Sequence, residues 1–181
     1  MTVDITTWLT ATHREITRIG GTRSARLRRP YDAPMADVWH ACTDRERLRR
    51  WFGGVTGEFR VGGELSIDVG MEQPVRATIL HCEPPRRLTI TWTYADDIFD
   101  PVDRVELRLS PDGDRTIVEL EHRSAGAPGW EAGVGSGWED WLLKLDVALR
   151  GGDPAALVDA DNHPHIDRQW LQVPTDAPSA G

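Results

Sequence analysis

The chain has 181 residues, 39% of them hydrophobic, and a formal net charge of −8 at pH 7. This length suits one domain with extensions, and the acidic balance argues against nucleic acid as a partner, because phosphate-binding surfaces are basic. No apolar run approaches the ~18 residues that cross a membrane, and the N-terminus lacks the features of a signal peptide, so we expect no membrane association.

The first predicted element is a helix over residues 4–19. Asp4 can cap its N-terminus, and the Gly20-Gly21 pair can end it. Its apolar stripe consists of Ile5, Trp8, Leu9, Thr12, Ile16 and Ile19. A stripe of this kind needs a partner, so we expect it to pack on the domain body or against a second copy of the chain, as a homodimer.

A strand and two short helices are predicted next. The strand covers 24–29, the first helix begins near Pro34, and the second covers 45–52 before Gly53-Gly54. From about residue 57 the apolar period changes from 3.6 to 2, which predicts strands. These strands cover residues 65–69, 75–82, 88–94, 102–110 and 116–122. Because the links between them are short, we expect an antiparallel meander.

The longest predicted helix covers residues 130–150 and is rich in tryptophan and glycine. Its apolar stripe consists of Trp130, Val134, Trp138, Trp141, Leu145 and Leu149. Gly133, Gly135 and Gly137 each cost this helix about 1 kcal/mol relative to alanine. Glycines beside wide indoles indicate either close backbone packing or the wall of a ligand cavity, and the sequence leaves both alternatives open.

This order of elements predicts an α+β fold of the helix-grip type, in which a curved antiparallel sheet wraps around the long helix. We divide the chain into an N-terminal helical extension (1–22), a helix-grip domain (23–150) and a partly disordered C-terminal extension (151–181). A curved sheet does not close tightly on a single helix, so a cavity is expected between them.

No motif of established chemistry is present. The sequence has no GxSxG elbow, P-loop or HExxH, and its cysteines, Cys42 and Cys82, form no CxxC pair. The His163-Pro164-His165 run, with nearby aspartates, lacks the spacing of a calcium loop. We therefore predict no catalytic set, no metal and no cofactor, and we expect a reducing, cytoplasmic location.

Two polar residues, His122 and Tyr94, lie on predicted strands at positions that point inward. They could orient a ligand or transfer a proton. Alternatively, His122 satisfies a backbone carbonyl and Tyr94 reaches solvent. The sequence identifies no acidic partner for His122, which weakens a role as general base.

The chain resembles the START-like (helix-grip, SRPBCC) superfamily, in its activator of heat shock protein 90 ATPase-like branch. The resemblance covers about residues 24–150 and rests on five stretches in the family's order. They are RPYDAPMADVWHACTDRERLRRWFGG, FRVGGELSIDVG, CEPPRRLTITWTY, VELRLSPDGDRTIVELEH and GVGSGWEDWLLKLDVAL.

The resemblance implies a deep, mostly apolar pocket beneath the long helix and no fixed catalytic residues. Members bind lipids, polyketides and other hydrophobic molecules, and a few branches are cyclases or hydratases. By position, the resemblance and the helix pattern together place nine residues at the pocket. They are Trp51 and Phe52 at its mouth, Trp92 and Tyr94 on the strands, and His122, Val134, Gly137, Trp138 and Trp141 at or near the helix.

We expect a non-enzymatic binding protein for a small hydrophobic or aromatic ligand, in a stress-related role. The first alternative is a cyclase or hydratase that uses His122 or Tyr94, and its mark would be a carboxylate within hydrogen-bond reach of the histidine. The second is a co-chaperone-like interaction module that uses the N-terminal helix or the arginine clusters at 23–29 and 45–50.

Overall fold

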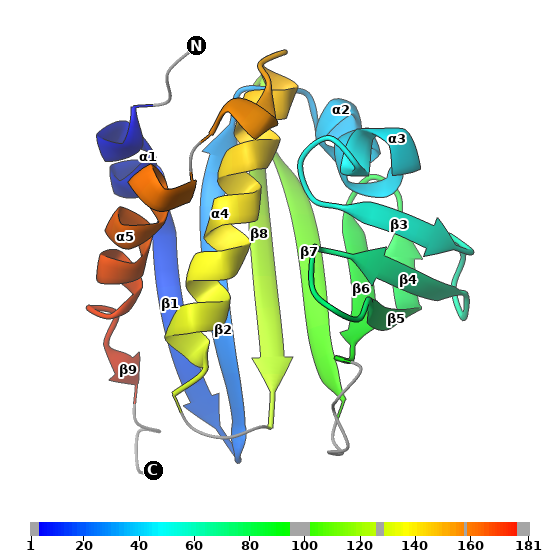
Figure 1. Cartoon of the computed structure of the whole chain (residues 1–181), viewed down its shortest axis with the longest axis horizontal. Helices are drawn as coiled ribbons and strands as arrows, with labels where there is room; N and C mark the ends of the chain where they lie inside the picture. Colours follow the sequence, from blue (N-terminus) through cyan, green and yellow to red (C-terminus); the bar gives the residue numbers. More distant parts are fainter. Residues whose placement is uncertain (1–3, 95–101, 126–128, 158, 177–181) are drawn as a thin grey trace.

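A curved sheet dominates the structure, a computed structural model that describes residues 4–94, 102–125, 129–157 and 159–176. In these ranges nine strands form one sheet in the order β3-β4-β5-β6-β7-β8-β2-β1-β9. The long helix α4 (Glu131–Leu149) lies across one face of the sheet, and α2 (Met35–Thr43) and α3 (Arg45–Leu48) cover its β3–β5 end (Figure 1). The predicted helix-grip fold is therefore confirmed.

All strand pairs are antiparallel except β1 with β9, which is parallel. The strands are β1 (His13–Ile19), β2 (Thr22–Tyr31), β3 (Gly54–Gly57), β4 (Glu64–Asp68), β5 (Val75–Glu83), β6 (Arg87–Trp92), β7 (Asp103–Asp112), β8 (Arg115–Ser124) and β9 (Thr175–Asp176). The remaining helices are α1 (Ile5–Ala11), the 3-10 turn η1 (Pro154–Ala156) and α5 (Asp159–Trp170). No helix in the described ranges is long and apolar enough to cross a membrane.

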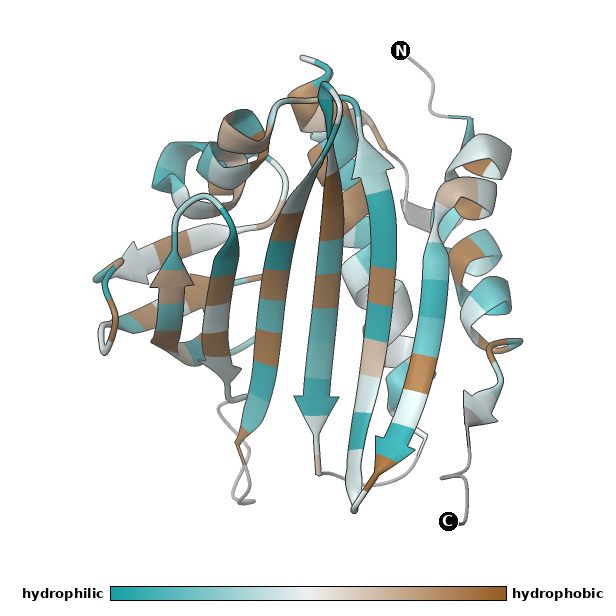
Figure 2. Ribbon diagram, turned by 180° about the vertical axis from the view of Figure 1, so that it is seen from behind, coloured by the Kyte–Doolittle hydropathy of each residue, from teal (hydrophilic) through white to brown (hydrophobic). Residues whose placement is uncertain are grey.

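The two-residue period of the long strands places their apolar side chains on the face that α4 covers. On β7, Val105, Leu107 and Leu109 are buried, whereas the residues between them are more exposed. Bands of hydrophobic and hydrophilic residues accordingly alternate along these strands (Figure 2). The core lies between this face, α4 and the α2–α3 segment.

The predicted helix over residues 4–19 is wrong beyond Ala11. Thr12 is extended, and β1 pairs with β2 in an antiparallel hairpin. Gly20 and Gly21, at φ +58° and +82°, form the two-residue turn between them instead of a helix end. A glycine pair suits such a turn, because both central residues need positive φ, and β-branched residues on either side favour strands.

The C-terminal segment has more structure than the sequence suggested. Helix α5 covers the His163–His165 run, and β9 pairs with β1 at the sheet edge. Two apolar residues of α5, Ile166 and Trp170, are almost fully buried. Residues 177–181, the last part of the extension that we expect to be partly disordered, lie outside the described residues. Elsewhere the second short helix ends at Leu48 rather than near residue 52, and β3 was not predicted.

A buried carboxylate joins both terminal segments to α4. Glu139, which is 0% exposed, accepts hydrogen bonds from the indole of Trp8 at 3.0 Å and from the indole of Trp170 at 2.8 Å. The Arg14 guanidinium supplies the opposite charge, with its Nε 2.8 Å from Glu139 Oε2. We call this group of four residues the Glu139 cluster. It brings α1, β1 and α5 onto the side of α4 that faces away from β3–β5.

The glycines of α4 divide between the two alternatives that the sequence left open. A Cβ added at Gly135 would lie 2.6 Å from the Trp170 ring, so this glycine permits close packing of α5. At Gly133 and Gly137 an added Cβ would meet nothing within 4 Å. Close packing therefore explains Gly135 alone.

Candidate functional site

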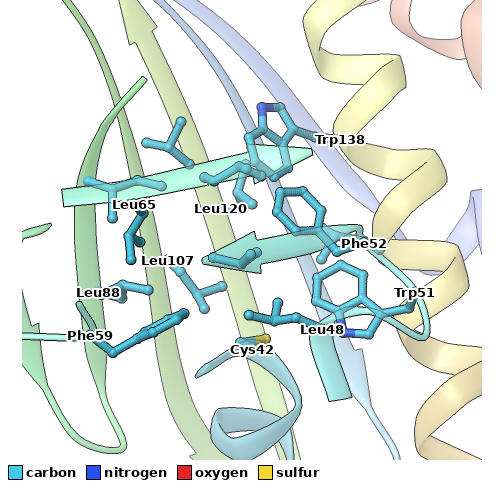
Figure 3. A pocket seen from close by; sticks show the side chains of 15 residues that line it. Cys42, Leu48, Trp51, Phe52, Phe59, Leu65, Leu88, Leu107, Leu120 and Trp138 are labelled. Atoms are coloured by element: carbon cyan, nitrogen blue, oxygen red, sulfur yellow. The ribbon is translucent and has the colours of Figure 1, made fainter. Parts of the chain in front are cut away.

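An apolar cavity of about 80 Å³ lies between the sheet, the α2–α3 segment and α4 (Figure 3). Inward-facing strand residues such as Leu65, Leu107 and Leu120 form one wall. Trp138 of α4 and the turn that follows α3 close the other side. The sheet thus supplies one wall and the helices with their connecting turn the other, and the cavity lies between them.

The polar groups of the cavity lining are already engaged or neutral. The Trp51 indole N–H donates to the backbone carbonyl of Ala41 at 2.9 Å, and the Trp138 indole donates to Nδ1 of His122 at 3.0 Å. Burial raises the pKa of the Cys42 thiol to about 12, so this group is not a thiolate nucleophile at neutral pH. The cavity can therefore hold an apolar group, but its lining side chains offer no nucleophile or general base.

Phe52 connects the cavity with a cluster of aromatic rings. Its ring stacks on that of Trp138, with centroids 5.8 Å apart and an interplanar angle of 14°. It also meets the edge of Trp141 at 4.9 Å and lies 6.3 Å from Trp92. Phe52 is half-buried, and its side chain is held by ring contacts.

The nine residues predicted for the site occupy three locations. Trp51, Phe52 and Trp138 line the cavity. Behind them, Trp92, Tyr94, His122 and Trp141 form the aromatic cluster without lining the cavity. Val134 and Gly137 lie on α4, half-buried and outside the lining. The sequence pattern therefore predicted aromatic residues of the site but none of the aliphatic residues that line the cavity.

His122 has the acidic partner that sequence reasoning missed. Its Nε2 lies 3.0 Å from Oδ2 of Asp103, the first residue of β7. Strand parity could have found this partner, because Asp103 stands two residues before the inward-facing Val105, which pairs with His122.

The bonds of His122 define its tautomer. An indole N–H can only donate, so Nδ1, which faces Trp138, must carry a lone pair. The ring proton of the neutral imidazole then lies on Nε2 and is donated to Asp103. His122 is 1% exposed, and both of its nitrogens are engaged. The arrangement holds Trp138 in place and leaves no nitrogen free to exchange a proton with a bound molecule.

Comparison with known proteins identifies the family. Residues 32–150 match the family described as "Activator of Hsp90 ATPase homolog 1-like protein". No curated protein matched the sequence. The crystal structure of CalU16 from Micromonospora echinospora is 40% identical in sequence, with a TM-score of 0.75 over 89% of this chain and 96% of that chain.

Two further solved structures are more distant. DynU16, a protein of the dynemicin biosynthetic locus, is 26% identical, with a TM-score of 0.67 over 72% of this chain and 49% of that chain. PFC0360w, an HSP90 activator from Plasmodium falciparum, is 20% identical, with a TM-score of 0.61, and shares the fold. The chain belongs to the Activator of Hsp90 ATPase homolog 1-like family, within the SRPBCC helix-grip superfamily.

Proposed function

We propose that the protein binds a small apolar or aromatic molecule in the cavity between the sheet and α4. The observation that carries this proposal is a cavity of about 80 Å³ whose lining is apolar and whose indole N–H groups are already bonded within the protein. An apolar ligand gains about 25 cal/mol for each Å² of surface removed from water, and here it displaces no hydrogen bond of the lining side chains.

The size of the cavity limits the ligand. A cavity of about 150 Å³ lined by apolar residues holds benzene, so about 80 Å³ accommodates part of a ring or the end of a longer molecule, and a whole ring requires side chains of the lining to move. A larger ligand also has to move side chains of the lining.

The geometry favours binding over cyclase or hydratase chemistry. The carboxylate expected of the enzyme is present, since Asp103 reaches His122. However, His122 does not line the cavity, and both of its nitrogens are engaged. The co-chaperone-like alternative would be favoured if the protein's own side chains filled the space between the sheet and α4. They leave a cavity of about 80 Å³ there. DynU16 belongs to a biosynthetic locus, and a small-molecule ligand agrees with that context.

Native mass spectrometry of the purified protein, followed by denaturing extraction, tests the proposal directly. A co-purifying apolar compound at stoichiometric level supports it. Toluene and naphthalene then serve as probes in thermal-shift and calorimetric titrations. An apo mass together with no response to either probe would overturn the proposal.

Two variants of β7 locate the binding site. Leu107 lines the cavity, whereas Leu109 is buried on the same face of the strand and does not. Leu107→Phe should occupy the cavity and abolish probe binding while the fold stays stable. Leu109→Phe should overpack the core, at a cost of about 1–3 kcal/mol, and leave binding unchanged. Equal binding by both variants would place the ligand elsewhere.

A further inference from the structure

We propose that the Asp103–His122 pair positions Trp138 and makes ligand retention depend on protons, so that protonation of His122 releases the ligand. This inference rests on the proposed function. It assigns to His122 a positioning role, rather than the general-base role that a cyclase or hydratase would require.

Three side chains form a hydrogen-bonded chain that leads from the beginning of β7 to the cavity. The Asp103 side chain is 18% exposed and accepts from Nε2 of His122 at 3.0 Å. Nδ1 of His122 accepts from the Trp138 indole at 3.0 Å. Trp138 is 6% exposed and lines the cavity, so the chain ends at the wall that a ligand would touch.

Protonation is incompatible with this arrangement. The imidazolium ion carries a proton on both nitrogens and has no lone pair, and an indole N–H cannot accept. When His122 is protonated, two donors therefore face each other across 3.0 Å. The Trp138 indole then has to turn away from Nδ1 or leave its buried donor unpaired, which is unfavourable.

A turn of the indole changes the cavity. Trp138 stacks on Phe52 and meets Trp92 and Trp141 with centroids 5.1 and 5.0 Å apart. These four rings pack against one another, so Trp138 cannot rotate without displacing Phe52, the other aromatic wall at this point. The protonated state therefore has a differently shaped cavity and a lower affinity for an apolar ligand.

The described surroundings of His122 contain one group able to stabilise its positive charge. Asp103 on β7 is the carboxylate bonded to the ring, and the neighbours opposite His122 are Ala25 on β2 and Val105 on β7. The rings that surround it, Trp92, Trp130 and Trp138, are uncharged.

The other charged groups that lie next to these residues in the described part of the chain point to the opposite face of the sheet or are paired. Arg104 and Arg123, the sequence neighbours of Asp103 and His122, are exposed residues, and Arg123 pairs with Glu121. Glu131, at the start of α4, pairs with Arg18 and Arg23. Asp103 is thus the one described carboxylate that faces the imidazolium ion, and the loss of the Trp138 bond is the consequence of protonation.

Naphthalene is a suitable probe, because it carries no charge at any pH. Its affinity should fall about tenfold between pH 8 and pH 5, which is the effect expected for one buried hydrogen bond. Circular dichroism at each pH verifies that the fold is retained. Equal affinity at both pH values would overturn the proposal.

Two substitutions separate positioning from general damage. His122→Asn places an amide oxygen near the location of Nδ1, so it keeps an acceptor for Trp138 but cannot titrate, and its affinity should be independent of pH. His122→Leu removes the acceptor, so its affinity should be low at every pH. The same pH dependence in His122→Asn as in the wild type would contradict the proposal.

A measurement without ligand distinguishes this proposal from the proposed function. In ¹H–¹⁵N spectra the indole resonance of Trp138, assigned by its absence in Trp138→Phe, should shift between pH 8 and pH 5 in the wild type but not in His122→Asn. If naphthalene fails to bind at any pH while this shift occurs, the proposed function fails and the positioning role stands. If naphthalene binds and no shift occurs, the positioning role fails alone.

Discussion

The two sides of α4 are packed in different ways. Trp138 faces the sheet through apolar ring contacts and leaves a cavity beside it. Glu139, the next residue, faces the terminal segments, where its carboxylate is satisfied by two indoles and a guanidinium. Apolar contacts do not need every partner in place and tolerate a gap, whereas a buried charge requires each of its partners. The cavity side is thus adaptable, and the Glu139 cluster is rigid.

Removal of the charge at the rigid side should have the largest effect. Glu139→Ala leaves Arg14 buried without its partner, so we expect a loss of about 3–5 kcal/mol in the free energy of unfolding, measured by urea denaturation. Glu64→Ala is the matched control, because Glu64 is exposed, and its effect should be within about 0.5 kcal/mol. If Glu139→Ala costs no more than this control, the two sides do not differ as described. Should Glu139→Ala not fold, Glu139→Gln keeps the shape of the side chain and tests the charge alone.

The glycines of α4 provide a smaller test of the same difference. Gly135→Ala places a methyl group 2.6 Å from the buried Trp170 ring, so overpacking should cost about 1–3 kcal/mol. Gly137→Ala meets open space and should gain up to about 1 kcal/mol from helix propensity. Thermal and urea unfolding of both variants gives the comparison. A destabilised Gly137→Ala would show that this part of the helix is packed more tightly than the structure indicates.

Acid sensitivity should arise from the outer face of the sheet, apart from both sides of α4. Burial alone would raise the pKa of Glu121, but the hydrogen bond from Arg123 and the charge of Arg26 outweigh it and lower that pKa. Because the folded pKa is depressed, this stabilisation is present above the pKa of the unfolded chain and is lost as pH falls through the folded value.

The measurement is urea unfolding from pH 6 down to pH 3. Stability should decline below about pH 4.5, the region where free carboxylates titrate. The decline should be smaller in Glu121→Gln. Glu83→Gln is the control, since Glu83 is exposed, and it should follow the wild type. An identical pH profile in Glu121→Gln and the wild type would remove Glu121 from this account.

The sequence predicts the helix-grip architecture because its main signals are local. Alternation along β7 and β8 and the helical stripe of α4 each arise within one element and survive folding. The segment before Gly20 is predicted as helix because Ile16 and Ile19 are three residues apart, a helical spacing. In β1 they lie on opposite faces, and only Ile16 is buried. The glycine pair can be recognised as a hairpin turn only when β2 is considered as the strand that pairs with the segment before it.

The site is less predictable, because a cavity depends on distances between elements. Parity identified Leu107 and Leu109 alike as inward-facing, and no feature of the sequence tells which of them borders the empty space. Nine residues were predicted for the site, mainly because of their aromatic side chains. Of these nine, only Trp51, Phe52 and Trp138 line the cavity. The role of Glu139 was equally hidden, since its partners lie 131, 125 and 31 positions away.

The Glu139 cluster also bears on where the cooperative folding unit ends. The stretch that matches the family covers residues 32–150, but Trp8, Arg14 and Trp170 all lie outside it. A fragment cut to that stretch would retain the carboxylate and lose every group that neutralises it, exposing the flank of α4 to solvent. The segment that matches the family is therefore shorter than the segment that we expect to unfold cooperatively.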